Sequence, residues 1–132
     1  MSGVFEVTVE TEFCAAHALR GEAREIEPLH GHNFKVHVTV GGEKLDALGT
    51  LIDFRDLQRL LERELDGWRN HNLNADVKEF RADGENLCPS AENIAFVLFR
   101  NLKSHLPSRV RLDCVRVSEA PGCWAAYRHA GD

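Results

Sequence analysis

Two histidines separated by a single glycine stand at the start of an apolar stretch, and their spacing suits metal binding. His30 and His32 flank Gly31. Side chains two residues apart in extended backbone point to the same side, so both imidazoles can reach one ion, and the glycine permits a close approach. If the first two strands pair as an antiparallel hairpin, His17 falls near the same end of the sheet. Three imidazoles without a fourth protein ligand are typical of a catalytic zinc site, which keeps one coordination position open.

These histidines also have a simpler interpretation. A His-x-His pair often consists of two solvated loop residues, and the spacing by itself leaves both interpretations open. Three other histidines need no function. His37 lies on the polar face of a predicted strand and is expected to be exposed, His105 lies near a helix C-terminus where a partly charged imidazole suits the helix dipole, and His129 lies in the tail.

Length and composition indicate one globular domain covering residues 1–132. The chain has 132 residues, 43% hydrophobic and 28% charged, with a formal net charge of −5. This length supports a hydrophobic core without disulfides. The acidic excess argues against a nucleic-acid partner, because no basic stripe is available to neutralise phosphates. No apolar run approaches the roughly 20 residues that cross a bilayer, so no membrane partner is expected.

The cysteines and the first residues point to a cytoplasmic protein. Residues 1–6 lack the charged and apolar regions of a secretory signal. The four cysteines form no C-x-x-C pair, and we expect them to be reduced thiols; they are Cys14, Cys88, Cys114 and Cys123.

Alternating apolar residues predict four strands. Residues 4–13 and 33–40 alternate apolar and polar side chains with a period of two, as in strands with one buried face. The sequence ends with two more predicted strands, 110–117 and 123–127, joined by a turn at Pro121-Gly122.

Two helices are predicted between these pairs of strands. Asp53 is a good N-cap for the first helix, whose leucines recur at helical spacing, and Gly67 is a plausible C-cap. Ser90 caps the second helix, which Pro107 ends, and a long loop is expected from about Trp68 to Pro89. The order ββααββ predicts an α+β fold in which two helices pack on one face of a four-stranded antiparallel sheet.

Six segments, in order, carry a resemblance to a known family. The sequence resembles the 6-pyruvoyl-tetrahydropterin synthases, a family that includes the 6-carboxy-tetrahydropterin synthases of queuosine biosynthesis. The matching segments run from about Phe5 to Arg128; they are Phe13-Cys14-Ala15-Ala16-His17, Glu27-Pro28-Leu29-His30-Gly31-His32-Asn33-Phe34, Leu51-Ile52-Asp53-Phe54, Asn72-Leu73-Asn74, Pro89-Ser90-Ala91-Glu92-Asn93 and Val117-Ser118-Glu119-Ala120-Pro121-Gly122-Cys123.

The resemblance implies a fold, an assembly and a cofactor. The fold would be the tunnelling fold, in which trimers form a continuous barrel and two trimers stack as a homohexamer with active sites between subunits. The substrate would be 7,8-dihydroneopterin triphosphate. The zinc ligands would be His17, His30 and His32.

The resemblance also implies residues that bind the pterin. Glu119 would grip the pterin ring through paired hydrogen bonds, since an ionised carboxylate accepts two parallel N–H bonds strongly. The backbone at Ser90 and Ala91 would also touch the pterin. The alternative for Glu119 is a glutamate at the exposed end of a strand.

One departure from the family concerns the base. Ile26 stands where the commonest family pattern has a catalytic cysteine, and Glu27 follows it. This resembles a subgroup with a glutamate there, which cleaves the side chain to give 6-hydroxymethyl-dihydropterin for folate. A partly desolvated Glu27 near zinc could act as a base. The alternative is a solvated glutamate in the acidic stretch 22–27.

A second departure concerns proton transfer. Family members carry an Asp-His pair just before the Asn-Leu-Asn-like segment, and here Arg69 and Asn70 hold those positions. His71 comes one residue later. Either the loop shifts by one residue so that His71 serves as a catalytic residue, or the relay is absent.

The leading hypothesis is therefore a zinc-dependent lyase acting on a dihydroneopterin-type substrate. One alternative is a zinc-containing family member that binds a pterin or purine without the usual activity. Another is a protein whose zinc only stabilises the assembly, which predicts a fourth protein ligand and no open position.

Overall fold

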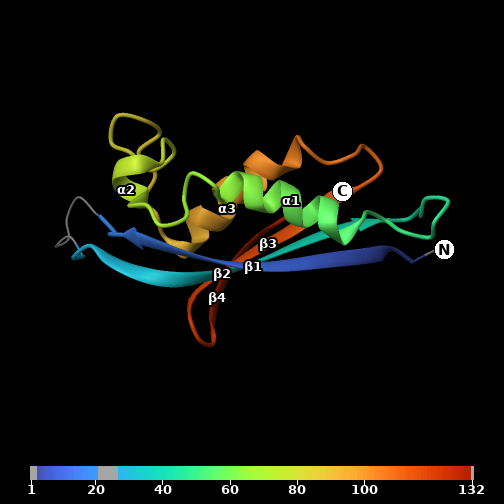
Figure 1. The fold of residues 1–132 in the computed structure, drawn as a ribbon, viewed down its shortest axis with the longest axis horizontal. Helices are drawn as coiled ribbons and strands as arrows, with labels where there is room; N and C mark the ends of the chain where they lie inside the picture. Colours follow the sequence, from blue (N-terminus) through green and yellow to red (C-terminus); the bar gives the residue numbers. More distant parts are fainter. Residues whose placement is uncertain (1–2, 21–26, 132) are drawn as a thin grey trace.

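The computed structural model describes residues 3–20 and 27–131. Ile26 and all of the acidic stretch except Glu27 lie outside the described residues. Seven elements follow one another along the chain, labelled in Figure 1: β1 (Phe5–His17), β2 (His30–Gly42), α1 (Phe54–Leu65), α2 (Leu73–Asp76), α3 (Ala91–Lys103), β3 (Arg111–Ala120) and β4 (Cys123–Arg128).

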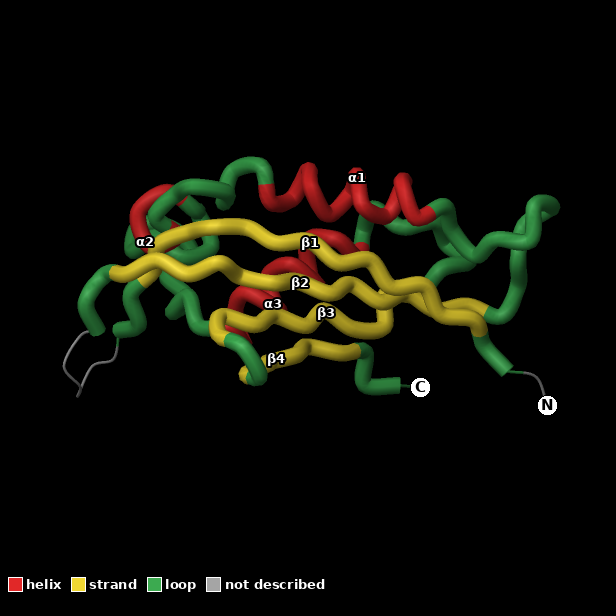
Figure 2. Tube along the Cα trace, turned by 60° about the horizontal axis from the view of Figure 1, so that its bottom comes forward, coloured by secondary structure: helices red, strands yellow, loops and turns green. Residues whose placement is uncertain are grey.

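The four strands form one antiparallel sheet in the order β1-β2-β3-β4. The helices lie over one face of this sheet and leave the other face uncovered (Figures 1 and 2). The predicted α+β class, with helices on one side of a four-stranded sheet, is therefore confirmed. Among the described residues, no helix has the length and apolar character needed to cross a membrane.

The core lies between the sheet and the two long helices. From the sheet, Phe13 and Phe34 stack with their ring centroids 5.0 Å apart. The apolar residues on the inward face of β2, from Phe34 to Val40, are fully buried, as the alternation predicted. The leucines of α1 and the apolar stripe of α3 cover this face, because side chains three or four residues apart share one side of a helix. The largest fully enclosed side chains of the two helices are Leu57, Leu61, Leu65, Ile94, Leu98 and Leu102.

The first two strands are longer than the apolar alternation predicted. They pair residue for residue from Phe5 opposite Gly42 to His17 opposite His30. The alternation covers only residues 4–13 and 33–40, although His17 was expected at the end of the first strand. Backbone pairing does not need that alternation, so the ladder continues to the histidines.

The long loop and the helix ends also differ from the predictions. The segment 68–89 contains the short helix α2, which Asn72 caps by accepting a hydrogen bond from the Ala75 amide. Helix α1 ends at Leu65 with Asp66 as its C-cap, so Gly67 is not the cap. Asp66 keeps a right-handed helical conformation, and the chain turns onward through Trp68, whose amide donates to the Leu65 carbonyl. That turn needs no left-handed glycine.

Candidate metal centre and active site

The hairpin register places three imidazoles together at one end of the sheet. His17 and His30 face each other across β1 and β2, and His32 pairs with Ala15 two residues further along. The ring centroids of the three histidines lie 4.7–5.1 Å apart. One nitrogen from each ring can be chosen so that all three lie within 4.8 Å of one another. The expected convergence of His17, His30 and His32 is therefore found.

Backbone carbonyls orient two of these rings. The Nδ1–H of His17 donates to the Pro89 carbonyl at 2.7 Å, and that of His30 donates to the Pro28 carbonyl at the same distance. A carbonyl can only accept, so these bonds select the tautomer whose Nε2 carries the lone pair. The second ring nitrogen of a metal-binding histidine is commonly held in this way.

The environment of His17 favours the neutral form that binds metals. Its side chain is 1% exposed, and its Nε2 is buried with no hydrogen-bond partner among the described residues. Burial lowers the pKa of His17 below its usual range, although the Pro89 carbonyl and Glu119 act in the opposite direction. An orphaned buried nitrogen aimed at two other imidazoles fits a zinc ion, whose ligands must be deprotonated.

Two carboxylates border the histidine group. An oxygen of Glu119, at the end of β3, lies 3.4 Å from His17 Nε2 and 3.8 Å from His32 Nε2. Oε1 of Glu27 lies 3.5 Å from His30 Nε2, and it is buried without a hydrogen-bond partner among the described residues. Glu119 therefore lies beside the histidine group, and Glu27 has its Oε1 buried beside His30 although its side chain as a whole is 41% exposed.

The N-terminus of α3 adjoins the same group. Ser90 Oγ accepts from the Asn93 amide at 3.1 Å, so the predicted cap is present. Pro89, one residue earlier, supplies the carbonyl that holds His17, which places Ser90 and Ala91 directly after a contact to the metal-binding group. Sequence reasoning missed this role of Pro89, since any residue could offer a carbonyl.

His71 is brought near the end of β1 by its backbone. Its carbonyl accepts from the Ala16 amide at 2.9 Å, next to His17 in the chain. Its ring is exposed and bonds through Nδ1 to the Arg69 carbonyl at 2.8 Å. Within the described part of the chain, the ring is not one of the three that could hold a metal.

The residues at the positions of the family's Asp-His pair are structural. The Arg69 guanidinium pairs with Glu62 of α1 and donates to the Glu12 carbonyl on β1 at 2.6 Å. Asn70 adopts a left-handed conformation with φ 62°, and its amide donates to the Cys14 carbonyl. Together they fasten the 68–72 segment to the edge of the sheet.

Asn74 is a positioning residue that the sequence analysis did not find. Its amide group exchanges two hydrogen bonds with the backbone of Ala18, at 2.8 and 2.9 Å. The chain directly after His17 is therefore fixed to the start of α2. An Asn-Leu-Asn sequence carried no physical signal for this pairing, which connects residues 56 apart in the chain.

Comparison with solved structures defines the class of this fold. The chain superposes on 6-pyruvoyl tetrahydropterin synthase of Caenorhabditis elegans with a TM-score of 0.81 and 26% identity, covering 98% of each chain. The architecture is therefore the tunnelling fold of tetrahydropterin synthases.

Sequence comparison gives the family. The model of the family described as 6-pyruvoyl tetrahydropterin synthase matches residues 6–130, so the chain belongs to that family and is an enzyme of the tetrahydropterin synthase kind. A 6-carboxy-5,6,7,8-tetrahydropterin synthase of Bacillus subtilis is 30% identical over 94% of this chain and 85% of its own length. A dihydroneopterin monophosphate aldolase of Pyrococcus furiosus is 31% identical over 80% of this chain and 82% of its own.

Proposed function

We propose that the protein is a zinc-dependent lyase that acts on 7,8-dihydroneopterin triphosphate or a close relative of it. The observation that carries this proposal is the convergence of three imidazole nitrogens around the buried, unpartnered Nε2 of His17. His17, His30 and His32 would hold the ion. Bound zinc supplies a Lewis acid that polarises the side-chain hydroxyls of the substrate and makes neighbouring protons easier to remove.

Glu27 is the proposed base. Its Oε1 is buried and lies 3.5 Å from Nε2 of His30, one of the three imidazoles that would hold the ion, and no described residue donates a hydrogen bond to this oxygen. A carboxylate oxygen without a donor keeps its lone pairs for a substrate proton. Removal of that proton would start the isomerisation that precedes loss of triphosphate or cleavage of a carbon–carbon bond.

Glu119 is proposed to bind the substrate at a point next to the metal-binding histidines. In the sequence-based hypothesis its carboxylate grips the amino and ring nitrogens of the pterin, with the backbone at Ser90 and Ala91 touching the ring. Its closeness to His17 and His32 supports a contact to the part of the substrate nearest the ion. A pterin held by Glu119 would therefore lie immediately beside the three histidines.

His71 is proposed to assist proton transfer. Donation of its Nδ1–H to the Arg69 carbonyl leaves Nε2 as an acceptor, and its backbone is tied to Ala16 beside His17. Its ring is exposed, so it would act only when the site is closed by another subunit or by substrate. The His71→Ala variant tests this role. Its zinc content should not change, whereas its turnover should fall.

The product distinguishes the possible reactions. Incubation of the zinc-loaded protein with 7,8-dihydroneopterin triphosphate, followed by chromatography of the products, separates three outcomes. A 6-carboxy product would indicate the queuosine branch, a 6-hydroxymethyl product the folate branch, and a 6-pyruvoyl product the biopterin branch. Tight pterin binding without any turnover would disprove the lyase proposal.

Pterin binding without turnover is the result expected from a second candidate function. In this alternative, the chain is a zinc-containing protein that binds a pterin or purine without catalysis. The observation in its favour is the structural use of Arg69 and Asn70, which occupy the positions of the family's Asp-His pair. Glu27 favours the enzyme over this candidate, because a pure binding site has no need for an unpartnered buried carboxylate oxygen.

A homohexamer made of two stacked trimers is the proposed assembly. Both edges of the sheet, β1 and β4, lack a neighbouring strand within the described chain. Strand β4 is mostly exposed and carries Trp124 and Tyr127, which are 38% and 41% exposed. The 70–72 segment covers the β1 edge only near Cys14 and Ala16. Strand edges that are otherwise open, or that carry aromatic side chains, are suited to pairing with another copy. Light scattering on the purified protein would measure the mass, and a monomer would contradict the proposal.

A cytoplasmic location is also proposed. Cys14, Cys88, Cys114 and Cys123 are all free thiols in the structure, as expected for a reducing compartment.

A further inference from the structure

A cavity lies at the end of the sheet opposite the three histidines. Its volume is about 560 Å³, and it is bordered by the Gly41-Gly42 end of β2, the end of α3 and the segment that leads into β3. Strand β2 runs thirteen residues from His30 to Gly42. At about 3.3 Å per residue, this places the cavity about 40 Å from the metal-binding group. The proposed active site does not use it.

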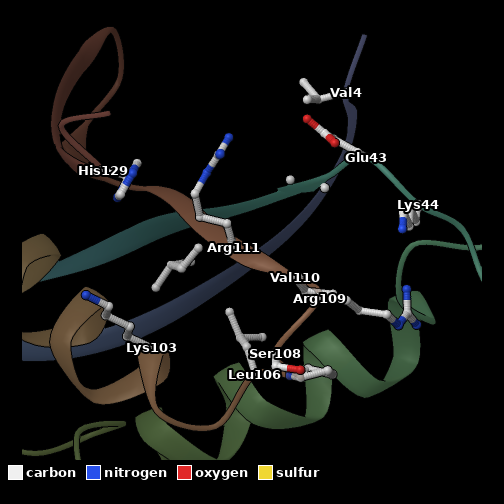
Figure 3. A pocket seen from close by; sticks show the side chains of 14 residues that line it. Val4, Glu43, Lys44, Lys103, Leu106, Ser108, Arg109, Val110, Arg111 and His129 are labelled. Carbon is white, nitrogen blue, oxygen red and sulfur yellow. The ribbon is translucent and has the colours of Figure 1, made fainter. Parts of the chain in front are cut away.

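The cavity has an apolar floor and a cationic rim. Leu106, Val110 and Leu112 form the floor. Figure 3 shows Lys103 and Arg111 on one side of the cavity, and Lys44 and Arg109 on the other. Cations on opposite sides suit a ligand that carries more than one negative group.

Three of these cations are available to a ligand. The Arg109 guanidinium lies 3.9 Å from Asp46, a weak contact. The Asp46 carboxylate is already occupied, since it accepts hydrogen bonds from the amides of Leu48 and Thr50 and from the Thr50 hydroxyl. Within the described part of the chain, no carboxylate lies within ion-pair distance of Lys44 or Lys103.

Few acidic groups oppose this charge. The Asp113 carboxylate accepts a hydrogen bond from Arg111 at 2.5 Å. It also packs so closely against Gly41 that any larger residue at position 41 would clash with it. Among the described residues that line the cavity, Glu43 is the only acidic one. A local excess of positive charge therefore exists in a chain whose net charge is −5.

We propose that this cavity binds a polyphosphate chain, either free inorganic triphosphate or the triphosphate of a nucleotide. Lys103 would hold one end of the chain and Arg109 with Lys44 the other, since lysine and arginine donate charge-assisted hydrogen bonds to phosphate oxygens. The apolar floor borders the same cavity as these exposed cations. It also offers a surface for a nucleobase, which would distinguish the two sources.

The test is a titration with inorganic triphosphate that is monitored by NMR. The amide signals of Gly42 and Ser108 report on this cavity alone. Saturable shifts are expected. Lys103→Ala and Arg109→Ala should each weaken the apparent affinity about tenfold, the effect of losing one hydrogen bond to a charged group. The matched control is Lys78→Ala, which removes an exposed lysine elsewhere and should leave the curve unchanged.

His30→Ala separates this site from the metal centre, and it should not change the shifts of Gly42 and Ser108. The proposal is overturned if triphosphate does not shift these amides, or if Lys103→Ala leaves the curve unchanged. It is also overturned if Lys78→Ala weakens binding as much as Lys103→Ala, which would indicate unspecific attraction. A parallel titration with ATP identifies the source, because tighter binding of ATP than of triphosphate shows that the floor holds the base.

Discussion

The two ends of the β1-β2 hairpin differ in how their polar groups are exposed to solvent. At the histidine end, His17 is 1% exposed and its ring is held by a backbone carbonyl, so its chemistry depends on buried geometry. At the other end, Lys44, Lys103 and Arg109 are exposed around an open cavity. Buried polar groups need defined partners, whereas exposed charges interact weakly and are screened by salt. Substitutions should therefore have the largest effects at the first end and smaller, salt-dependent effects at the second.

The largest effect is expected for His17→Ala. Removal of one of three zinc ligands should abolish stoichiometric zinc binding and reduce turnover by about a thousandfold or more, since ligand loss costs both affinity and orientation. Elemental analysis of the purified variant measures the metal. The matched control is His105→Ala, an exposed histidine after α3, which should retain zinc and activity. Full zinc occupancy in the His17 variant would refute the metal centre.

Glu27→Gln should reduce turnover by about a hundredfold while zinc remains bound, because an amide cannot accept the proton that a general base removes. Steady-state kinetics and metal analysis of the same sample give both quantities. Glu6→Gln, an exposed position on β1, is the control. Unchanged turnover in the Glu27 variant would remove this residue from the mechanism.

The pH dependence of stability should also differ between the ends. Burial holds the pKa of His17 below its usual value of 6.5, so near that pH the unfolded chain binds a proton that the folded chain does not. Stability should therefore be full above about pH 6.5 and should fall as the pH drops toward the folded pKa. Thermal melts of metal-free protein between pH 5.5 and 7.5 test this sign. The dependence should be weaker in His17→Gln but unchanged in His105→Gln, and equal dependence in all three proteins would contradict it.

The smallest effect compares two serines at opposite ends. Ser90→Ala should destabilise the fold by about 1 kcal/mol, because the Asn93 amide loses its cap. Ser108→Ala, exposed beside the cationic cavity, should change the free energy of unfolding by less than about 0.5 kcal/mol. Urea denaturation measures both values. Equal losses of unfolding free energy in the two variants would show that the Ser90 cap contributes no more stability than an exposed serine.

Much of the fold was predictable because its signals are local. Residues 33–40 alternate side chains across a sheet, and Asp53 and Ser90 cap helices through contacts within three residues. The continuation of β1 to His17 was not predictable from alternation, because cross-strand backbone bonds hold it. The short helix α2 was missed because its four residues have no room for an apolar period.

The candidate site divides in the same way. The spacing of His30 and His32 in extended backbone already aimed both rings to one side, and the hairpin placed His17 nearby. The positions of Glu27 and Glu119 relative to those rings could not be derived from spacing, since Glu119 is 87 residues from His32 in the chain (119 − 32). Only the pairing of β2 with β3 brings that carboxylate to the histidines.

The sequence by itself determined the four strands, the two long helices, their buried faces and three metal-ligand candidates, because these depend on periodicity and on residue types at short range. Its ordered motifs carried the resemblance to the family. The tertiary structure alone decided which groups lack partners. Among the described residues, Nε2 of His17 and Oε1 of Glu27 have no hydrogen-bond partner, and Arg69 fastens a loop to the sheet. Hydrogen bonding and burial join residues that are distant in the chain, so they exist only once the chain is folded.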